Sequence, residues 1–553
     1  MNRIAQVVKS FTQNFTQNPK NDILAGLTVS MAMIPEVVAF AFVAQIDPLV
    51  ALSGAFIIGL ITAIFGGRPG LISGAAGAVA VIFVSMISEG HNRGMLFDSP
   101  IENMGYFYLL GAVILMGIIQ VLAGVLKLGK FVRLIPHSVM MGFVNGLAIV
   151  IFIAQVKMFT HKKMEITANG VKQYLNIPME GMELYLMLGL VGLTMLMIWV
   201  IPKLTTKIPA ALCAILVTTA LVIFGGIETS TVGSYIIEGG GTGLKGEFPT
   251  PNTDFWANLP FNMETLNFIL PYAVLAAAVG LIESLMTLNL VDELTGTRGS
   301  GNRECVAQGT GNILSGLFGG TGGCGMIGQT VININSGGRG RLSGVMMALT
   351  LLTFILFADK YIEQVPIAAL VGVMFMMVIE TFAWSSFRII NKIPKSDAAV
   401  LIIVSVVTVF FDLAIAVIAG VLISALVFAW QNATMIRARK RIKEDGTKVY
   451  EIWGPLFFGS IQNFNEKFDS KTDPRNVEID FMESKVTDHS GMEAVSNIAD
   501  KYMKLGINLK LTHLSPECKM LLLKAHPNLE SIIETSVEDP RYYVVTDMMD
   551  TEV

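Results

Sequence analysis

Apolar stretches recur along the first four fifths of the chain, separated by short polar segments. An apolar run of about 20 residues can cross a bilayer as a helix. We expect about fourteen spans, in two sets on either side of the hydrophilic segment 226–262. The first set is predicted at 23–45, 48–65, 71–88, 105–126, 136–157, 183–201 and 209–225. The second set is predicted at 267–290, 304–318, 326–335, 342–358, 366–382, 397–412 and 413–430.

The pattern changes after residue 435, where charges become dense and apolar runs shorten to strand length. We therefore predict an N-terminal segment at 1–22, a membrane region at 23–435 and a soluble domain at 436–553. An apolar, helical membrane region followed by one soluble domain is the expected architecture.

Strand and helix patterns alternate within the soluble domain. Val477–Phe481 alternates like a strand, 491–505 has helical spacing, and 508–511 reads as a second strand. This alternation indicates an α/β unit. The basic stretch 437–443 is expected to be a linker to the last span.

Two glycine-rich segments begin almost alike, one running from Phe65 to Gly77 and one from Phe318 to Gln329. Glycine-interrupted apolar segments in corresponding positions of two halves indicate a midplane site built from broken helices. Seven spans in each half would invert the second half relative to the first. The sequence therefore predicts inverted repeats at 23–225 and 267–430, which are typical of transporters.

Basic residues near the span ends predict the orientation. Arg437, Arg439 and Lys440 follow the last span, and Lys9 and Lys20 precede the first. With an even number of spans both termini lie on one side, which we expect to be cytoplasmic. The predicted location is the cell (inner) membrane, with multiple spans.

Composition narrows the function classes. The chain of 553 residues is 53% hydrophobic and 15% charged, and its net charge of −4 gives no signal for a nucleic-acid partner. Its four cysteines are scattered, without a CxxC pair, which supports neither a disulfide framework nor a metal site. We find no nucleophile–base set and no phosphate-binding loop, so we expect neither an enzyme nor a cofactor.

Several stretches together resemble one family. The matching stretches are Gly26–Ala41 with its Ile34-Pro35-Glu36 core, Phe65–Ala78, Gln308–Gly320 and Asn335–Arg339. They resemble the SulP family of anion transporters, whose animal relatives include prestin and pendrin. The C-terminal part, with Thr487–Gly491 between a strand and a helix, resembles a STAS domain.

The resemblance implies a fold and a site. Spans 1–4 and 8–11 would form a core, spans 5–7 and 12–14 a gate, and the protein a homodimer. The anion would lie between the N-termini of half-helices three and ten, which present N–H groups and partial positive charge. The implied substrate-binding residues are Glu36, Phe40, Ser73, Ala76, Gly77, Met326, Ile327, Gly328 and Gln329.

Two carboxylates within predicted spans point to coupling with a cation. A carboxylate inside the membrane is costly, so Glu283 is expected to be functional. Thr287 lies one turn further on the same helix face. In the family, the position of Glu283 carries an acid tied to cation coupling in several bacterial members. Protonation, or Na⁺ bound at Glu283 and Thr287, would remove the repulsion of an incoming anion.

Glu36 departs from the family pattern, which often has an uncharged residue there. It is expected to be a second proton or cation site, or else a cap for N–H groups freed beside Pro35. Gln329 stands where mammalian relatives have a positively charged residue. Its neutral amide does not indicate which anion is bound. Met326 and Ile327 lack the hydroxyl that helps to hold Na⁺ in a relative, which favours protons.

The sequence therefore predicts a secondary active transporter that couples protons to the uptake of bicarbonate, sulfate or a dicarboxylate. A Na⁺-coupled symporter or an anion exchanger is the alternative, and a nucleobase–cation symporter or a non-transporting STAS scaffold is more distant. The expected partners are the anion, membrane lipid, a second copy of the chain and a cytoplasmic protein bound by the STAS domain. The anion, the coupled ion and the phosphorylation of Ser490 stay open.

Overall fold

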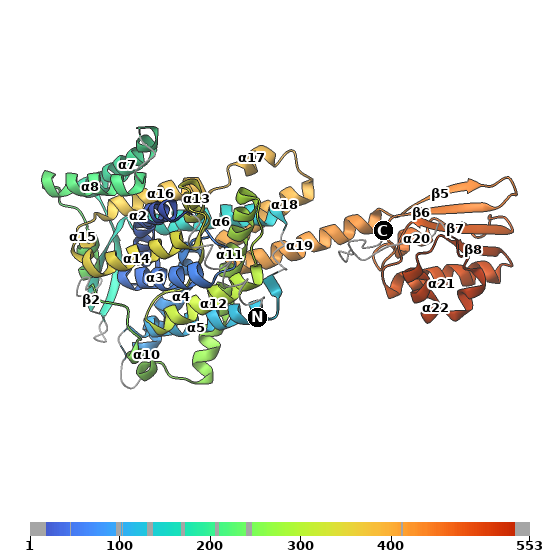
Figure 1. The fold of residues 1–553 in the computed structure, drawn as a ribbon, viewed down its shortest axis with the longest axis horizontal. Coiled ribbons are helices and arrows are strands. Elements are labelled where there is room, and N and C mark those ends of the chain that lie inside the picture. The colour runs from blue at the N-terminus through green and yellow to red at the C-terminus, as the bar shows by residue number, and fades with distance from the viewer. Residues whose placement is uncertain are drawn as a thin grey trace. The chain divides into compact units, whose positions relative to one another are not determined.

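A computed structural model describes residues 18–44, 46–95, 101, 103–129, 136–166, 172–204, 209–238, 246–410 and 413–536. It contains two compact units, Met1–Val421 and Leu422–Val553, and the division falls within one long helix (Figure 1). The predicted N-terminal segment 1–22 lies mostly outside the described residues.

The first half of the membrane unit is a series of helices. They are α2 (Pro19–Ala44), α3 (Pro48–Phe65), α4 (Gly77–Met95), α5 (Met104–Val125), α6 (His137–Val156), α7 (Gly181–Leu204) and α8 (Ala210–Gly225). The hairpin β2 (Thr160–Ile166) and β3 (Lys172–Pro178) follows α6, and α9 (Val232–Glu238) and α10 (Thr253–Asn258) follow α8.

The second half repeats the series. Its main helices are α11 (Met263–Thr295), α12 (Gly301–Leu317), α13 (Ile327–Asn335), α14 (Arg341–Phe357), α16 (Ile367–Thr381), α18 (Lys395–Phe410) and α19 (Leu413–Thr434). Short helices α15 (Asp359–Glu363) and α17 (Ser385–Ile389) lie between them. Each of the predicted apolar segments thus contains a helix.

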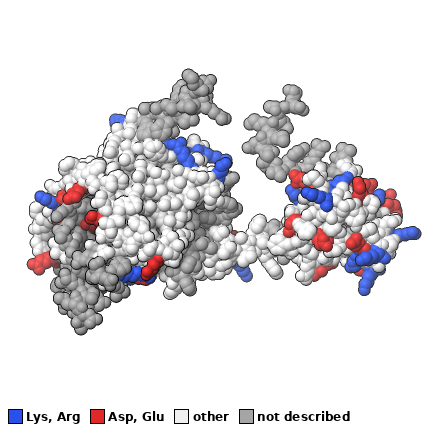
Figure 2. All heavy atoms as spheres, turned by 90° about the horizontal axis from the view of Figure 1, so that it is seen from below, with Lys and Arg blue, Asp and Glu red and all other residues white. Residues whose placement is uncertain are grey.

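The length and composition of seven helices within the described residues suffice for a membrane crossing. Three further apolar helices, Ala210–Gly225, Arg341–Phe357 and Ala419–Gln431, are shorter. The helical membrane architecture is confirmed, whereas a total of fourteen spans stays a prediction. Figure 2 shows how few charged side chains interrupt the visible surface of this unit, and how densely both signs cover the C-terminal unit.

Local chemistry fixes several helix ends. The Asp47 side chain accepts from the backbone N–H of Leu49 at 2.7 Å, and Pro48 occupies the first turn of α3. Asn262 caps the start of α11 by accepting from Thr265, and Gly296 ends that helix with a left-handed φ of 65°. These caps satisfy backbone groups that a helix end leaves without partners.

The helices pack as two groups. The core bundle consists of α2, α3, α4, α5, α11, α12, α13 and α14, which contact one another. The gate bundle consists of α6, α7, α8, α16 and α18, where α18 packs on α6, and α16 packs on α6, α7 and α8. This grouping follows the division that the resemblance implies.

A two-stranded sheet joins the halves inside the core bundle. β1 (Ser73–Ala75) pairs antiparallel with β4 (Gly323–Gly325), with Ser73 opposite Gly325 and Ala75 opposite Gly323. α4 and α13 begin two residues after these strands. Extended backbone is tolerated at membrane depth only where protein surrounds it, and all six residues are buried.

The C-terminal unit is an α/β domain. Its sheet has the order β5 (Arg437–Ile442), β6 (Lys448–Trp453), β7 (Asn476–Glu483) and β8 (Asn508–Thr512). β5 is antiparallel to β6, and the other two pairings are parallel. Helices α20 (Ile461–Asn465), α21 (His489–Lys504) and α22 (Pro516–Ala525) and a 3₁₀ helix (Pro527–Ile532) complete the unit.

The α/β prediction is confirmed, but the expectation of a linker at 437–443 is wrong. Most of that stretch is β5, paired in full register with β6. Its charged side chains are mostly exposed, as is common for an edge strand, so its composition resembles that of a linker.

A buried carboxylate ties the loop before β7 to the sheet. Although burial opposes its charge, hydrogen bonds from Lys448, Tyr502 and Tyr450 hold the pKa of Asp473 below its ordinary value. The contribution of these bonds to stability is therefore present above the unfolded-state pKa of Asp473 and is lost as the pH falls through its lower folded-state pKa.

Candidate functional site

A cavity of about 310 Å³ lies between the core and gate bundles. The core contributes side chains of α2 and α11 and the starts of α4 and α13, and the gate contributes side chains of α6, α7, α8 and α16. Eight of the predicted substrate-binding residues line this cavity, namely Glu36, Phe40, Ala76, Gly77, Met326, Ile327, Gly328 and Gln329. Glu283 lines it as well.

Glu36 contributes a buried carboxylate from the middle of α2, directly after the internal Pro35. Its Oε2 accepts a hydrogen bond from Nε2 of Gln329 on α13. Its Oε1 is buried and has no hydrogen-bond partner among the described residues. A buried acceptor without a partner is costly, so this oxygen can take a proton or meet a bound group.

Glu283 lies on α11, where its Oε2 accepts from Sγ of Cys324 in β4 at 3.0 Å. The Thr287 hydroxyl, one turn later, donates to the Glu283 carbonyl at 2.8 Å and lies 3.2 Å from the Gly325 carbonyl. Thr287 is fully buried and does not line the cavity. The hydroxyl thus joins α11 to β4 through backbone oxygens instead of contacting the Glu283 carboxylate.

The two half-helices present their first turns differently. A Cβ atom on Gly77, at the start of α4, would lie 2.2 Å from the Phe40 ring. A Cβ atom on Gly328, at the start of α13, would meet nothing within 4 Å. The start of α4 is therefore covered by an aromatic ring, while the start of α13 is open to the cavity.

Ser73 does not line the cavity. Its hydroxyl accepts from Gln308 of α12 at 2.6 Å. The same Gln308 nitrogen donates to Glu304 at 2.9 Å, and Glu304 also accepts from the Gly67 backbone at 2.7 Å. This buried polar chain fixes β1 to α12, so Ser73 supports the broken segment from behind.

β4 is held by side chains of neighbouring helices. Asn312 exchanges two hydrogen bonds with the Gly323 backbone, at 2.9 and 3.0 Å, and donates to Gln120 at 2.9 Å. The Ser284 hydroxyl accepts from the Gly325 N–H at 2.8 Å. These contacts give the short strand a fixed position, and with it the first turn of α13.

Sequence reasoning missed the gate side of the cavity. Glu380 and Thr381, at the end of α16, line it together with Met376 and Met377. The available signal was an acid in the last turn of an apolar segment, which is hard to distinguish from a solvated span end. Among the residues that the structure describes, the lining contains three carboxylates and no Lys, Arg or His.

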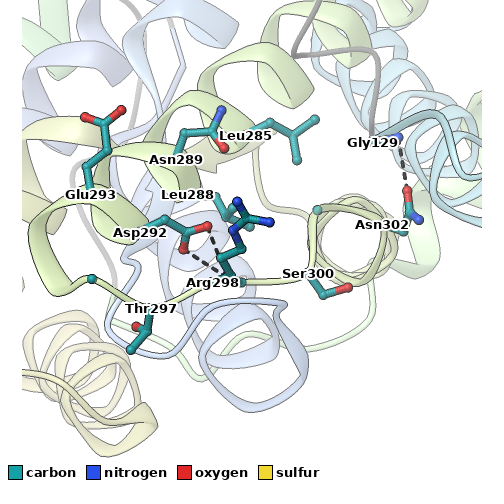
Figure 3. A pocket seen from close by; sticks show the side chains of 13 residues that line it. Gly129, Leu285, Leu288, Asn289, Asp292, Glu293, Thr297, Arg298, Ser300 and Asn302 are labelled. Carbon is teal, nitrogen blue, oxygen red and sulfur yellow. Dashed lines mark hydrogen bonds between the residues drawn. The ribbon is translucent and has the colours of Figure 1, made fainter. Parts of the chain in front are cut away.

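A second cavity, of about 550 Å³, lies around the loop between α11 and α12 (Figure 3). Figure 3 shows the Asp292 carboxylate turned toward this loop, where it accepts from the Gly299 N–H at 2.9 and 3.1 Å. Asp292 also pairs with Arg68 at 3.2 Å. Its carboxylate is thus committed to holding the loop.

Among the described residues, no group of three or more His, Cys, Asp or Glu side chains could hold a metal ion. What the first cavity offers is backbone N–H groups at two helix starts, three carboxylates and apolar walls.

A many-helix membrane unit whose halves meet in two half-helices beside a cavity defines a secondary transporter with broken helices. The comparisons with known proteins agree with that class. Residues 20–404 match the model of the sulfate permease family, and residues 439–539 match that of the STAS domain. The chain belongs to the sulfate permease family, which is a family of transporters and not of enzymes.

Relatives match over most of their length. The Bacillus subtilis protein YbaR, whose name assigns it provisionally to sulfate transport, is 37% identical over 93% of this chain and 98% of its own. The bicarbonate transporter BicA of Picosynechococcus is 30% identical over 80% of this chain and 79% of its own.

Solved structures share the fold. The transmembrane domain of a cyanobacterial BicA is 30% identical, has a TM-score of 0.60, and is matched over 73% of this chain and 98% of that domain. The murine anion transporter Slc26a9, in an inward-facing state, has a TM-score of 0.77 at 16% identity, over 97% of this chain and 94% of its own.

Proposed function

We propose that this protein takes up a small anion by alternating access and couples that uptake to protons. The anion would bind in the cavity between the core and gate bundles, against the open first turn of α13. One solved relative, at 30% identity, is a bicarbonate transporter, and the name of another relative points to sulfate. Bicarbonate, sulfate and dicarboxylates are therefore the candidate substrates.

The observation that carries this proposal is the unpartnered Oε1 of Glu36 beside two helix N-termini. An ionised carboxylate there would repel an anion, and the described part of the cavity lining contains no cationic side chain to offset it. A proton on Glu36 would remove the repulsion and supply a donor to the anion. The same argument applies to Glu283, whose carboxylate accepts one hydrogen bond from the residues that the structure describes, and that bond comes from a thiol.

Coupling to Na⁺ instead of protons is the alternative, and part of the geometry is compatible with it. The carbonyl oxygens of Glu283 and Gly325 meet the Thr287 hydroxyl, and oxygen groups of this kind suit a hard cation. However, both carbonyls already accept from this hydroxyl, and the side chains of Met326 and Ile327 add no oxygen. We therefore favour protons.

We propose that both termini lie in the cytoplasm and that the protein resides in the inner membrane. Basic residues support it: Arg68, Lys127, Arg298, Arg339 and Lys392 fall in connections that a fourteen-span topology places on the same side as the termini. The proposed domain limits are 1–22, 23–435 and 436–553. The STAS domain would then be a cytoplasmic regulatory or pairing module, and a homodimer is the proposed assembly.

Uptake into proteoliposomes tests the function. The full chain is reconstituted, and uptake of labelled hydrogencarbonate and labelled sulfate is measured under an imposed pH gradient, and separately under a Na⁺ gradient of equal size. The proposal expects accumulation driven by the inward proton gradient. Accumulation driven only by Na⁺ would mean that Na⁺, and not the proton, is the coupled ion. The absence of uptake for every candidate anion would refute transport of these substrates.

A further inference from the structure

The gate side of the anion cavity contributes one charged group, Glu380. It faces the same cavity as the core carboxylates Glu36 and Glu283, and none of the described lining residues is Lys, Arg or His. Within the described lining, the positive counterpart therefore comes from helix N-termini, which carry about half a unit charge each. In such a site, one further negative charge makes the electrostatic energy of an incoming anion less favourable.

Glu380 differs from Glu36 in its exposure. Its side chain is exposed, whereas Glu36 is buried. Glu380 lines the cavity, and a carboxylate that meets water in an open cavity keeps its charge at a lower cost than a buried one. Glu380 is thus the acid of this cavity best suited to remain charged while the anion enters.

The backbone around Glu380 is held firmly. The Trp384 indole N–H donates to the Ile379 carbonyl at 2.8 Å. Asn145 of α6 accepts from the Ala383 N–H at 2.8 Å and donates to the Ser386 hydroxyl at 3.0 Å. This end of α16 is therefore anchored within the gate bundle, so the Glu380 charge has a defined place.

Helix stability does not account for an acid at this position. Glu380 lies in the last turn of α16, where the helix dipole disfavours negative charge. It belongs to no ion pair among the described residues. A residue that opposes a local rule without compensation is a candidate for function.

We propose that Glu380 selects singly charged over doubly charged anions, by placing a fixed negative charge on the gate side of the anion cavity. This inference rests on the proposed function and narrows its substrates to monoanions. The Coulomb energy is proportional to the charge of the anion. A charge that weakens monoanion binding about fivefold therefore weakens dianion binding about 25-fold at the same place.

Competition in proteoliposomes measures this selectivity. Uptake of labelled hydrogencarbonate by the full chain is inhibited with unlabelled nitrate, a monoanion, or sulfate, a dianion. Glu380→Gln removes the charge, Glu380→Asp retains it, and Asp397→Asn removes a carboxylate from gate helix α18 outside the cavity. Glu380→Ser is a second neutral variant in case Glu380→Gln does not fold.

Wild type is expected to be inhibited more strongly by nitrate than by sulfate. In Glu380→Gln, the inhibition constant should fall about fivefold for nitrate and about 25-fold for sulfate. Glu380→Asp and Asp397→Asn should keep the wild-type ratio. A sulfate-to-nitrate ratio unchanged in Glu380→Gln, or a wild type that prefers sulfate, overturns the role of Glu380 while leaving transport intact. No uptake by wild type would instead refute the proposed function, and this inference with it.

Discussion

The two broken segments occupy matching places in the two halves, yet they differ in what they present to the cavity. α4 has 19 residues and begins at Gly77 beneath the Phe40 ring, whereas α13 has nine and begins beside the open Gly328. Their carboxylates differ as well. Glu36 is bound by Gln329 of the other half, while Glu283 is bound by Cys324 of its own half.

This difference indicates that the two repeats have different roles, although they share one architecture. The α13 side offers space and open N–H groups, so it suits the anion. The start of α4 is covered by the Phe40 ring and packs against it, so this side suits the role of a rigid support for the site. Repeats related by topology can thus share a backbone arrangement while only one of them forms the contact surface.

Glu283→Gln should have the largest effect, because it removes the acid to which we assign the coupling of a cation. We expect loss of gradient-driven accumulation, about a tenfold drop for each pH unit and each proton coupled, with some exchange retained. Uptake under imposed pH and Na⁺ gradients measures this. Glu293→Gln, an exposed acid on the same helix, is the matched control. A variant that still responds fully to either gradient would remove Glu283 from coupling.

Gly328→Val tests the open side. Its side chain has room, so folding should be preserved, but it would occupy the place that we assign to the anion. We expect binding to weaken by at least about tenfold, which corresponds to about 1.4 kcal/mol. Binding isotherms and thermal melts on the purified variant provide the measurement. Wild-type affinity would show that the anion does not bind there.

Gly77→Ala tests the closed side. The added methyl group would collide with the Phe40 ring, so we expect a loss of about 1–3 kcal/mol in stability and a lower melting temperature. Combining it with Phe40→Leu should restore part of this loss. If Gly77→Ala melted like wild type but lost anion binding, α4 would be a contact surface too, and the two sides would be alike.

Glu36→Gln should change the pH profile more than the maximal rate. If Glu36 must be neutral for the anion to bind, wild-type uptake falls as the pH rises and Glu36 loses its proton. The variant stays neutral, so its optimum should move upward or the profile flatten. Initial uptake rates across a pH series test this. An identical profile and affinity would reduce Glu36 to a structural cap.

The smallest effect is expected from removing the STAS domain, which belongs to neither half of the membrane unit. Truncation after residue 436 eliminates the STAS domain, whereas the described residues that line the anion cavity belong to the membrane unit. The membrane unit should fold and bind the anion, with an altered transport rate. Equilibrium binding to the truncated protein is the measurement, with size-exclusion chromatography as a check of folding. A well-folded product without binding would contradict this expectation.

Much of this arrangement could be predicted from the sequence. The glycine interruptions and the intramembrane acids Glu36 and Glu283 stand out because each is costly in an apolar helix. Glu380 could not be recognised, since an acid at a span end is ordinary and only packing shows that α16 turns it toward the cavity. Sequence spacing also gives no way to learn that Ser73 contacts α12 and Thr287 contacts β4, because both contacts depend on how distant segments pair.

The pairing of β1 with β4 also affects how the chain is made. Ala75 meets Gly323 only after about 250 further residues have been synthesised, which takes roughly 12–50 s at usual translation rates. During that interval the first broken segment is in place without its partner strand, and its backbone groups need temporary partners. Biogenesis of this protein therefore includes a waiting period, during which the nascent first half depends on the insertion machinery, on lipid headgroups or on water for shelter.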